Sequence, residues 1–214
     1  MRKRWYGFLV AIVLLSMAVT SFAAWHRLPW TDEGNFSCAA FNIAHRGFFG
    51  TTVLDPAGNN LPRIDQRTYW IVPGYPLFEA AFYKIAPASI FWSRLLNTLL
   101  TPLIAWAAYR TVAGLLNDPL TSILAAGFLV LSYNYLWATS WARPENLCLL
   151  LGLGGMAAYL SWRELHFKRA ILVSQTLVCL SGLVHPNGLL HFLGLGLIVL
   201  VLDRHRIHLT TVLL

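Results

Sequence analysis

The sequence predicts an all-α protein, a polytopic transmembrane helical bundle with a long external loop that carries juxtamembrane helices. Three observations support this prediction. Hydrophobic residues make up 57% of the 214 residues and charged residues only 12%, whereas soluble domains average about 45–50% and about 25%. The apolar residues form successive runs of about 17–25 residues, long enough to cross a bilayer. Lys and Arg gather in short clusters between these runs, as they do beside membrane helices.

The net charge of +7 raises the question of nucleic-acid binding. A nucleic-acid interface needs a basic patch or stripe along one face, whereas the basic residues here lie mostly in the connections between apolar runs. We therefore interpret the charge as a membrane-topology signal. The expected partner is the lipid bilayer, and no nucleic acid is expected.

The first crossing is predicted at about 8–24, directly after the basic cluster at 2–4. The same run could instead be a cleavable signal peptide, since Ser21 and Ala23 form a small-residue site. Trp25 follows as a typical interface anchor and favours a retained helix. Both interpretations deliver the following segment across the membrane.

Lys and Arg prefer the cytoplasmic side of a membrane, so the basic clusters orient the remaining crossings. The clusters at 163–169 and 203–206 are cytoplasmic in this scheme, as is the amino terminus. The stretch 25–92 is one long external loop. Five further crossings follow it, at about 93–116, 120–140, 147–162, 170–184 and 189–202.

Within the external loop, residues 75–86 are apolar and aromatic but contain Glu79 and Lys84. The segment is too short to span, and its two charges would be costly at the bilayer centre. We predict an interface helix that lies along the membrane surface. Residues 210–214 look like the start of a seventh crossing, so we expect residues 1–214 to be a single transmembrane domain, the amino-terminal part of a longer protein.

Three polar motifs fall on the external side of this topology, each at the end of a crossing. They are Asp32-Glu33, Arg143-Pro144-Glu145 and His185-Pro186-Asn187. Helix ends on one membrane face can converge on a cavity, where paired carboxylates supply a general base and a charge stabiliser, or a cation site. The alternative is structural, because acidic residues also suit the first turn of a helix, here one that begins near Gly34.

Five motifs follow one another over nearly the whole chain. They are Trp30-Thr31-Asp32-Glu33-Gly34, Pro73-Gly74-Tyr75-Pro76-Leu77, Ser93-Arg94-Leu95-Leu96-Asn97, Trp141-Ala142-Arg143-Pro144-Glu145-Asn146-Leu147 and Gly182-Leu183-Val184-His185-Pro186-Asn187-Gly188. This order resembles the amino-terminal half of the polyprenyl-phosphate-dependent membrane glycosyltransferases. That superfamily includes the protein O-mannosyltransferases, the lipid A aminoarabinose transferases and the catalytic subunit of oligosaccharyltransferase.

The resemblance implies an enzyme of the bacterial plasma membrane, the cell inner membrane, that transfers a sugar from a polyprenyl-phosphate carrier to an external lipid, glycan or protein acceptor. It also implies that Asp32 is catalytic, with Glu33 beside it in the acidic pair. An acceptor that attacks the anomeric carbon needs a carboxylate to take its proton, and the lipid-phosphate leaving group needs a cation in a poorly hydrated site. Arg143 is the candidate for that contact, and an interface anchor is the alternative.

The resemblance also implies roles for residues later in the chain. Glu145 stands where relatives place a second catalytic acidic residue, often Asp, and otherwise it serves as an N-terminal carboxylate of the following crossing. His185 and Asn187 stand where relatives have a Thr-Lys-Gly or similar turn, so they would bind phosphate or sugar. The Lys is missing here, and a structural histidine is the alternative. Tyr75, at the start of the interface helix, is a further substrate-binding candidate.

We expect no cofactor and no catalytic metal. The oligosaccharyltransferase branch uses a divalent cation at its acidic cluster, whereas the branches that the adjacent Asp32 and Glu33 resemble do not require one. A divalent cation is therefore the disfavoured alternative. The cysteines, at positions 38, 148 and 179, lack the spacing of metal ligands.

Two other classes of function stay open. A transporter or channel would place ionisable residues at mid-membrane depth, yet only Arg94, Arg110 and His191 fall within or near a crossing, each close enough to an end to extend toward water. A non-catalytic membrane scaffold, whose external loop binds a partner, would not require Asp32 and Glu145 to meet.

Overall fold

The computed structural model describes residues 2–206, and within this range it is helical, with no strand. The helices are α1 (Arg2–His26), α2 (Thr31–Arg46), α3 (Gly74–Phe82), α4 (Ile90–Leu99), α5 (Thr101–Leu116), α6 (Pro119–Leu131), α7 (Tyr133–Thr139), α8 (Glu145–Trp162), α9 (Phe167–Val184) and α10 (Gly188–Asp203), followed by a 3-10 turn at Arg204–Arg206. The all-α prediction is confirmed for this part of the chain. The predicted seventh crossing at 210–214 lies outside the described residues.

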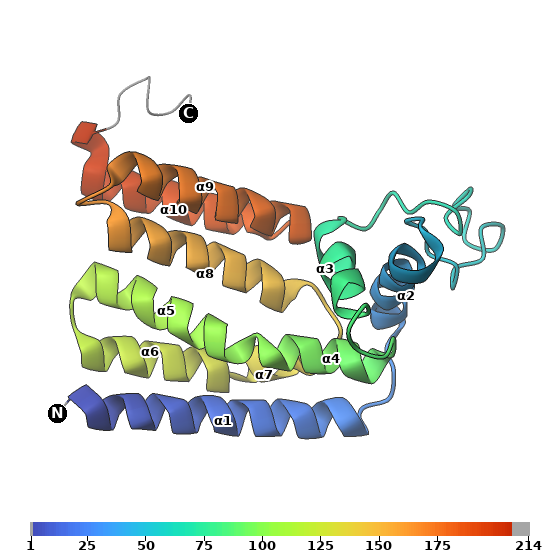
Figure 1. Cartoon of the computed structure of the whole chain (residues 1–214), viewed down its shortest axis with the longest axis horizontal. Coiled ribbons are helices and arrows are strands. Elements are labelled where there is room, and N and C mark those ends of the chain that lie inside the picture. The colour runs from blue at the N-terminus through green and yellow to red at the C-terminus, as the bar shows by residue number, and fades with distance from the viewer. Residues whose placement is uncertain (1, 207–214) are drawn as a thin grey trace.

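The long helices lie side by side in one bundle, and the chain reverses direction at each connection (Figure 1). One end of the bundle carries α2, α3 and the connections at 140–144 and 185–187. We name it the loop end. The opposite end carries the start of α1, the 163–166 connection and the 204–206 turn, and we name it the terminal end. The three polar motifs of the sequence therefore share one end of the molecule.

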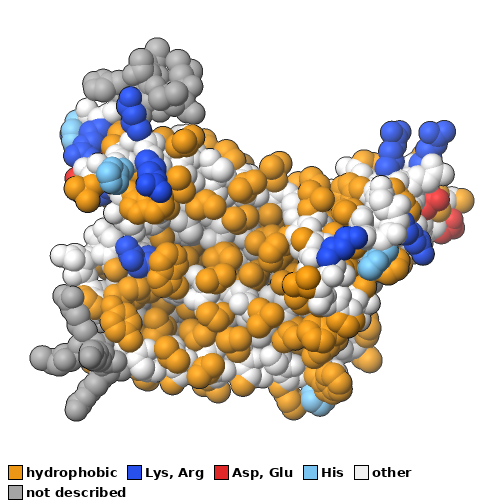
Figure 2. All heavy atoms as spheres, viewed as in Figure 1, with side chains coloured by type: hydrophobic (Ala, Val, Ile, Leu, Met, Phe, Trp, Pro, Cys, Tyr) orange, Lys and Arg blue, Asp and Glu red, His pale blue; other side chains and the backbone are white. Residues whose placement is uncertain are grey.

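Within residues 2–206, four helices are long and apolar enough to cross a membrane. They are Trp5–His26, Ile90–Leu116, Phe167–Val184 and Gly188–Arg206. These coincide with the predicted crossings at 8–24, 93–116, 170–184 and 189–202. Hydrophobic side chains cover the visible face of the bundle, and charged side chains gather toward its two ends (Figure 2). Both observations fit an integral membrane protein.

The predicted continuous crossing at 120–140 was wrong in one respect, because the structure divides it. Helices α6 and α7 meet at an angle of 55° at Ser132. Ser132 has an extended backbone (φ −62°, ψ 144°), and its hydroxyl accepts a hydrogen bond from the Tyr135 N–H at 3.3 Å, which starts α7 afresh. A serine that caps a helix competes with helix continuation. Counted as one broken span, this pair would be a fifth crossing.

The predicted crossing at 147–162 corresponds to α8, which is not among the helices that are apolar enough by themselves. Its first turn contains Glu145 and Asn146, which lower its hydropathy. Helix α8 packs against both α5 and α9, and its Tyr159 side chain is fully buried. It is therefore the central helix of the bundle, and its crossing stays a prediction.

The segment predicted as an external loop, 25–92, contains two short helices at the loop end. Helix α3 corresponds to the predicted interface helix at 75–86 but ends four residues earlier, at Phe82. It packs on α2 and on the end of α9 (Figure 1). Gly74 permits this contact, because a Cβ there would lie 2.5 Å from the Leu183 carbonyl oxygen. Helix α2 ends at Arg46 and is capped by Gly47, whose positive φ of 76° suits glycine.

Candidate functional site

Helix α2 presents Asp32 and Glu33 in its first turn. The Trp30 N–H donates to Glu33 Oε2 at 2.9 Å, so the Glu33 side chain reaches back to cap the start of its own helix. Glu33 therefore has the structural role that was the alternative for the acidic pair, that of a carboxylate in the first turn of a helix. Asp32 points elsewhere, and the two neighbouring carboxylates have separate surroundings.

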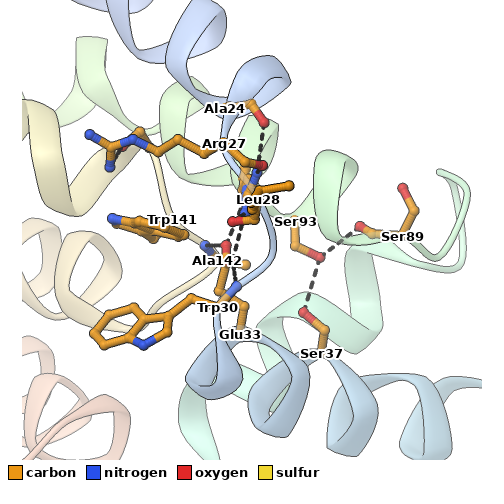
Figure 3. A network of polar contacts seen from close by, with 12 residues as sticks. Ala24, Arg27, Leu28, Trp30, Glu33, Ser37, Ser89, Ser93, Trp141 and Ala142 are labelled. Carbon is orange, nitrogen blue, oxygen red and sulfur yellow. Dashed lines mark hydrogen bonds and ion pairs between the residues drawn. The ribbon is translucent and has the colours of Figure 1, made fainter.

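Glu33 forms a buried ion pair with Arg94 of α4. Arg94 Nε donates to Oε1 at 2.7 Å and a second guanidinium nitrogen donates to Oε2 at 2.6 Å, a bidentate arrangement with both side chains almost completely buried. The Ala142 N–H also donates to Oε1, at 2.8 Å. Figure 3 shows how Trp30, Glu33 and Ala142 meet in this network.

The remaining donors of Arg94 bind the end of α1. They reach the carbonyl oxygens of Ala24, Arg27 and Leu28 at 2.8, 2.9 and 3.1 Å. We expected Arg94 to extend toward water, and this was wrong, because its side chain is only 3% exposed. Since both oxygens of Glu33 already accept two hydrogen bonds each, Glu33 has no accessible oxygen for a substrate. Its part in the site is to join α1, α2, α4 and the 140–144 connection.

Asp32 and Glu145 are joined by Arg143. One guanidinium nitrogen of Arg143 lies 3.5 Å from Asp32 Oδ2, and the other lies 2.7 Å from Glu145 Oε1. The side chains of Asp32, Glu145 and Arg143 are 41%, 28% and 18% exposed. The three residues therefore form one charged cluster at the loop end, although more than a hundred positions separate Asp32 from Glu145 in the sequence. The cluster is open to solvent on the Asp32 side.

The 140–144 connection that carries Arg143 is held by α4. The side-chain amide of Asn97 donates to the carbonyl oxygens of Trp141 and Arg143 at 2.6 and 2.9 Å. The Arg143 guanidinium lies over the Trp30 ring, 4.9 Å from its centroid, and the Trp30 and Trp141 rings are 5.4 Å apart. These contacts fix the direction of Arg143 through its backbone and through cation–π stacking.

A cavity of about 440 Å³ opens beside this cluster, between α6, α7, α8 and α10. Its lining includes Glu145, His185 and Asn187, together with Asn134 and His191. The apolar side chains Leu129, Leu149 and Leu190 line it as well. Three of the predicted site residues therefore share one amphipathic cavity, whereas Asp32 and Arg143 lie outside its lining and are linked to it through Glu145.

His185 caps α9, and its ring nitrogen Nδ1 accepts from the Asn187 N–H at 3.1 Å. Burial lowers the pKa of His185, and the nearby Glu145 carboxylate opposes this shift. The imidazole is therefore neutral near pH 7 and can act as a hydrogen-bond donor or acceptor toward a ligand.

Tyr75 does not line the cavity. Its ring is fully buried in the hydrophobic core of the bundle, in one cluster with Val13, Leu100 and Val184. Burial together with Glu79 raises the pKa of its hydroxyl well above 10. Among the described residues, its hydroxyl has no hydrogen-bond partner. A substrate bound in this cavity would therefore not contact Tyr75 directly.

Buried polar atoms without partners concentrate in this region. Within the described residues, six of the nine such side-chain atoms belong to Tyr75, Glu79, Asn97, Trp141, Arg143 and Glu145. Buried polar groups are normally hydrogen-bonded, and each exception costs free energy. These atoms, on Arg143 and Glu145 above all, are suited to a polar ligand at the loop end.

Several members of this site stand in the sequence motifs without a predicted role in the site. Asn97 and Arg94 lie three residues apart on α4, so they share a face, and two strongly polar side chains in an otherwise apolar segment were the available signal. Trp30 likewise belongs to the first motif of the sequence, where it was given no role in the site. Among residues 2–206, no group of three His, Cys, Asp or Glu side chains is arranged to hold a metal ion.

Neither a protein-family model, nor a characterised protein, nor a solved structure matches the chain. The geometry of the site and the motifs of the sequence are therefore the observations that bear on its function.

Proposed function

We propose that this chain is part of a glycosyltransferase that moves a sugar from a polyprenyl-phosphate carrier to a lipid, glycan or protein acceptor. The observation that carries the proposal is the bridging of Asp32 and Glu145 by Arg143 beside an amphipathic cavity. A lipid-linked sugar phosphate needs a carboxylate, a cation and an apolar wall close together, and this arrangement supplies all three.

The reaction assigns one task to each charged group. The acceptor oxygen or nitrogen forms a bond to the anomeric carbon, the bond from that carbon to the phosphate oxygen breaks, and its electron pair leaves on the phosphate. Asp32 takes the proton of the acceptor, because it is the more exposed carboxylate and its contact with Arg143 is the longer one. Arg143 stabilises the negative charge on the departing phosphate.

Glu145 stays paired with Arg143 and faces the cavity, so it orients the bound sugar or acceptor. His185 and Asn187 contribute neutral hydrogen bonds from the same cavity. Glu33 acts through Arg94 and the 140–144 connection, as a positioning residue and not as a catalytic residue. No divalent cation enters this scheme, because the Arg143 guanidinium is the cation assigned to the departing phosphate.

We further propose that the loop end faces outward and the terminal end faces the cytoplasm of a bacterial cell. The basic clusters support this orientation, because they lie at the terminal end. A single cysteine placed at Lys168 should react with membrane-permeant thiol reagents only, whereas one placed at Arg67 should also react with impermeant reagents in intact cells. Labelling of Lys168→Cys from outside would overturn the orientation.

Replacement of Asp32 tests the enzymatic proposal directly. In the full-length protein, Asp32→Asn should lower sugar transfer by about 10²–10⁴-fold in turnover, while donor binding changes little, because the amide keeps its shape but takes no proton. Asp65→Asn, in the same external segment, is the matched control and should retain activity. A loss of less than about tenfold in Asp32→Asn would contradict a general-base role.

A transporter is the second candidate, and one observation favours it. His191 lies inside α10, shares a hydrogen bond of 2.9 Å with the Ser181 hydroxyl and lines the same cavity as Glu145. Ionisable groups within spans often mark ion paths. Proton uptake into vesicles that contain the full-length protein but no sugar donor, abolished in His191→Leu, would favour transport. Unchanged proton leak together with Asp32-dependent sugar transfer would exclude it.

A further inference from the structure

A second, apolar cavity lies between α1 and α5, away from the candidate site. It measures about 470 Å³, and its walls are the α1 residues Tyr6, Leu9, Val10, Val13, Leu14 and Met17 and the α5 residues Pro102, Ala105, Trp106, Tyr109 and Arg110. Eight of these eleven residues are hydrophobic and are neither Tyr nor Arg, and among the eight Val10, Leu14 and Trp106 are more than half exposed. The groove therefore opens sideways on the bundle, on a surface that faces lipid if these helices cross the membrane.

Polar groups gather at one end of this groove. The hydroxyls of Tyr6 and Tyr109 are hydrogen-bonded at 2.9 Å, and their rings meet edge to face. The same two tyrosines line a smaller cavity of about 170 Å³, together with Ala113, Asn117 and Pro119. An apolar groove and a polar chamber thus share the tyrosine pair as their common wall.

A cation stands at the same end. Arg110 lines the groove and is exposed; one of its nitrogens donates to the Ser161 hydroxyl at 2.9 Å. A guanidinium has five donors, so Arg110 has capacity for a phosphate group as well. Because Tyr6 is near the start of α1 and Arg110 is in the second half of α5, this polar end lies toward the terminal end of the bundle.

The length of the groove matches one membrane leaflet. Tyr6 and Met17 are separated by eleven residues of continuous helix, or about 16 Å at 1.5 Å per residue. The hydrocarbon core of a bilayer is about 30 Å thick, so each leaflet contributes about half of that. An acyl chain whose headgroup lies at Tyr6, Tyr109 and Arg110 would therefore end near Met17, at mid-membrane depth.

From these features we infer that the groove between α1 and α5 is a binding site for one anionic phospholipid of the leaflet at the terminal end. One acyl chain lies along α1, the phosphate binds Arg110, and the polar headgroup meets the tyrosine hydroxyls and the Asn117 amide. The positive charge of Arg110 favours a lipid with net negative charge over a zwitterionic one. This inference does not depend on the proposed enzymatic function, because it concerns the opposite end of the molecule.

Native mass spectrometry of the full-length protein, released from mild detergent with added phosphatidylglycerol or phosphatidylethanolamine, tests the inference. Unaltered protein should retain phosphatidylglycerol about tenfold more strongly than phosphatidylethanolamine. Arg110→Gln should remove most of this preference, because a charge-assisted phosphate contact is lost. Arg169→Gln, which alters another exposed arginine toward the same end, is the control and should keep it.

A filled groove supplies the second test. Val10→Trp places a large ring in the groove at a position that is 57% exposed, and it should abolish lipid retention without unfolding the protein. Leu15→Trp, on the same helix, 55% exposed and outside the groove, should not. Equal retention of lipid in Val10→Trp and Leu15→Trp would overturn the inference. So would a dimer that only Val10→Trp dissociates, because the occupant would then be a second copy of the chain.

Discussion

Asp32 and Glu33 are adjacent in the sequence, but the structure gives them opposite surroundings. Glu33 is fully buried, accepts four hydrogen bonds and pairs with a buried arginine from α4. Asp32 is 41% exposed and makes one long contact with Arg143, a partly exposed arginine. Of these two neighbouring carboxylates, Glu33 thus stabilises the fold, whereas Asp32 is accessible to a substrate.

The difference arises from helix geometry. Consecutive residues on an α-helix point about 100° apart, so the first turn of α2 turns Glu33 toward α1 and α4 and leaves Asp32 facing the 140–144 connection. The buried Glu33–Arg94 pair holds the backbone of the 140–144 connection through the Ala142 N–H. Arg143, on the same connection, binds Asp32 and Glu145 in the more exposed cluster. A carboxylate with every lone pair engaged makes a poor base, whereas a weakly paired and accessible one makes a good one.

Breaking the buried pair should have the largest effect on stability. Arg94→Ala leaves Glu33 buried without a cation and frees three carbonyl oxygens at the end of α1, so we expect a loss of about 3–5 kcal/mol in the free energy of unfolding. Unfolding in detergent, followed by circular dichroism, measures this. Arg67→Ala, an exposed arginine of the external segment, is the control. A loss below about 1 kcal/mol for Arg94→Ala would mean that the pair is not structural.

Glu79 sharpens the comparison, because it is a buried carboxyl that makes no ion pair in the described structure. Its Oε1 accepts from the Ser37 and Tyr83 hydroxyls at 2.7 and 2.9 Å, while Oε2 has no partner. Burial raises its pKa from an ordinary 4.5 to about 7. Figure 3 shows Ser37 and Ser93 of the same cluster beside the Glu33 network.

This pKa predicts a pH dependence of stability with a defined sign. Between pH 4.5 and 7 the folded state keeps a proton on Glu79 that the unfolded state has lost, so stability should fall as pH rises through this window and level off above it. The total loss is on the order of 3 kcal/mol. Glu79→Gln should remove this slope, which unfolding curves at several pH values would detect. A slope unchanged in Glu79→Gln would assign the pH dependence to another group.

Loss of the partly exposed arginine, Arg143, should have the smallest effect on stability. Arg143→Gln removes two partly exposed ion pairs, so we expect a change within about 1 kcal/mol in the free energy of unfolding. Sugar transfer in the full-length protein should nevertheless fall by about 10²-fold, because the departing phosphate loses its cation. Arg143→Lys should recover part of the activity. Destabilisation as large as that of Arg94→Ala would erase the distinction between the two arginines.

Much of the architecture could be predicted from hydropathy and charge alone. Four helices long enough to span lie where the sequence places them, because a run of about 20 apolar residues can satisfy its own backbone hydrogen bonds in lipid by forming a helix. The short helix α3 also lies where the sequence predicts a helix. The break at Ser132 could not be predicted with confidence from apolar periodicity, since a single serine inside an apolar run also occurs in continuous helices. Tertiary contacts of α7 decide between the two.

The sequence by itself determined which residue types stand at the helix ends, and so it placed Asp32, Arg143, Glu145 and His185 on one end of the bundle. Only the tertiary structure decided their partners. The assignment of Arg94 to Glu33 and of Arg143 to Asp32 and Glu145 depends on the packing of α1, α2 and α4 and on the course of the 140–144 connection. Charges attract at any sequence separation, so the pairing of two arginines with three carboxylates is set by distance and burial, which no local pattern contains.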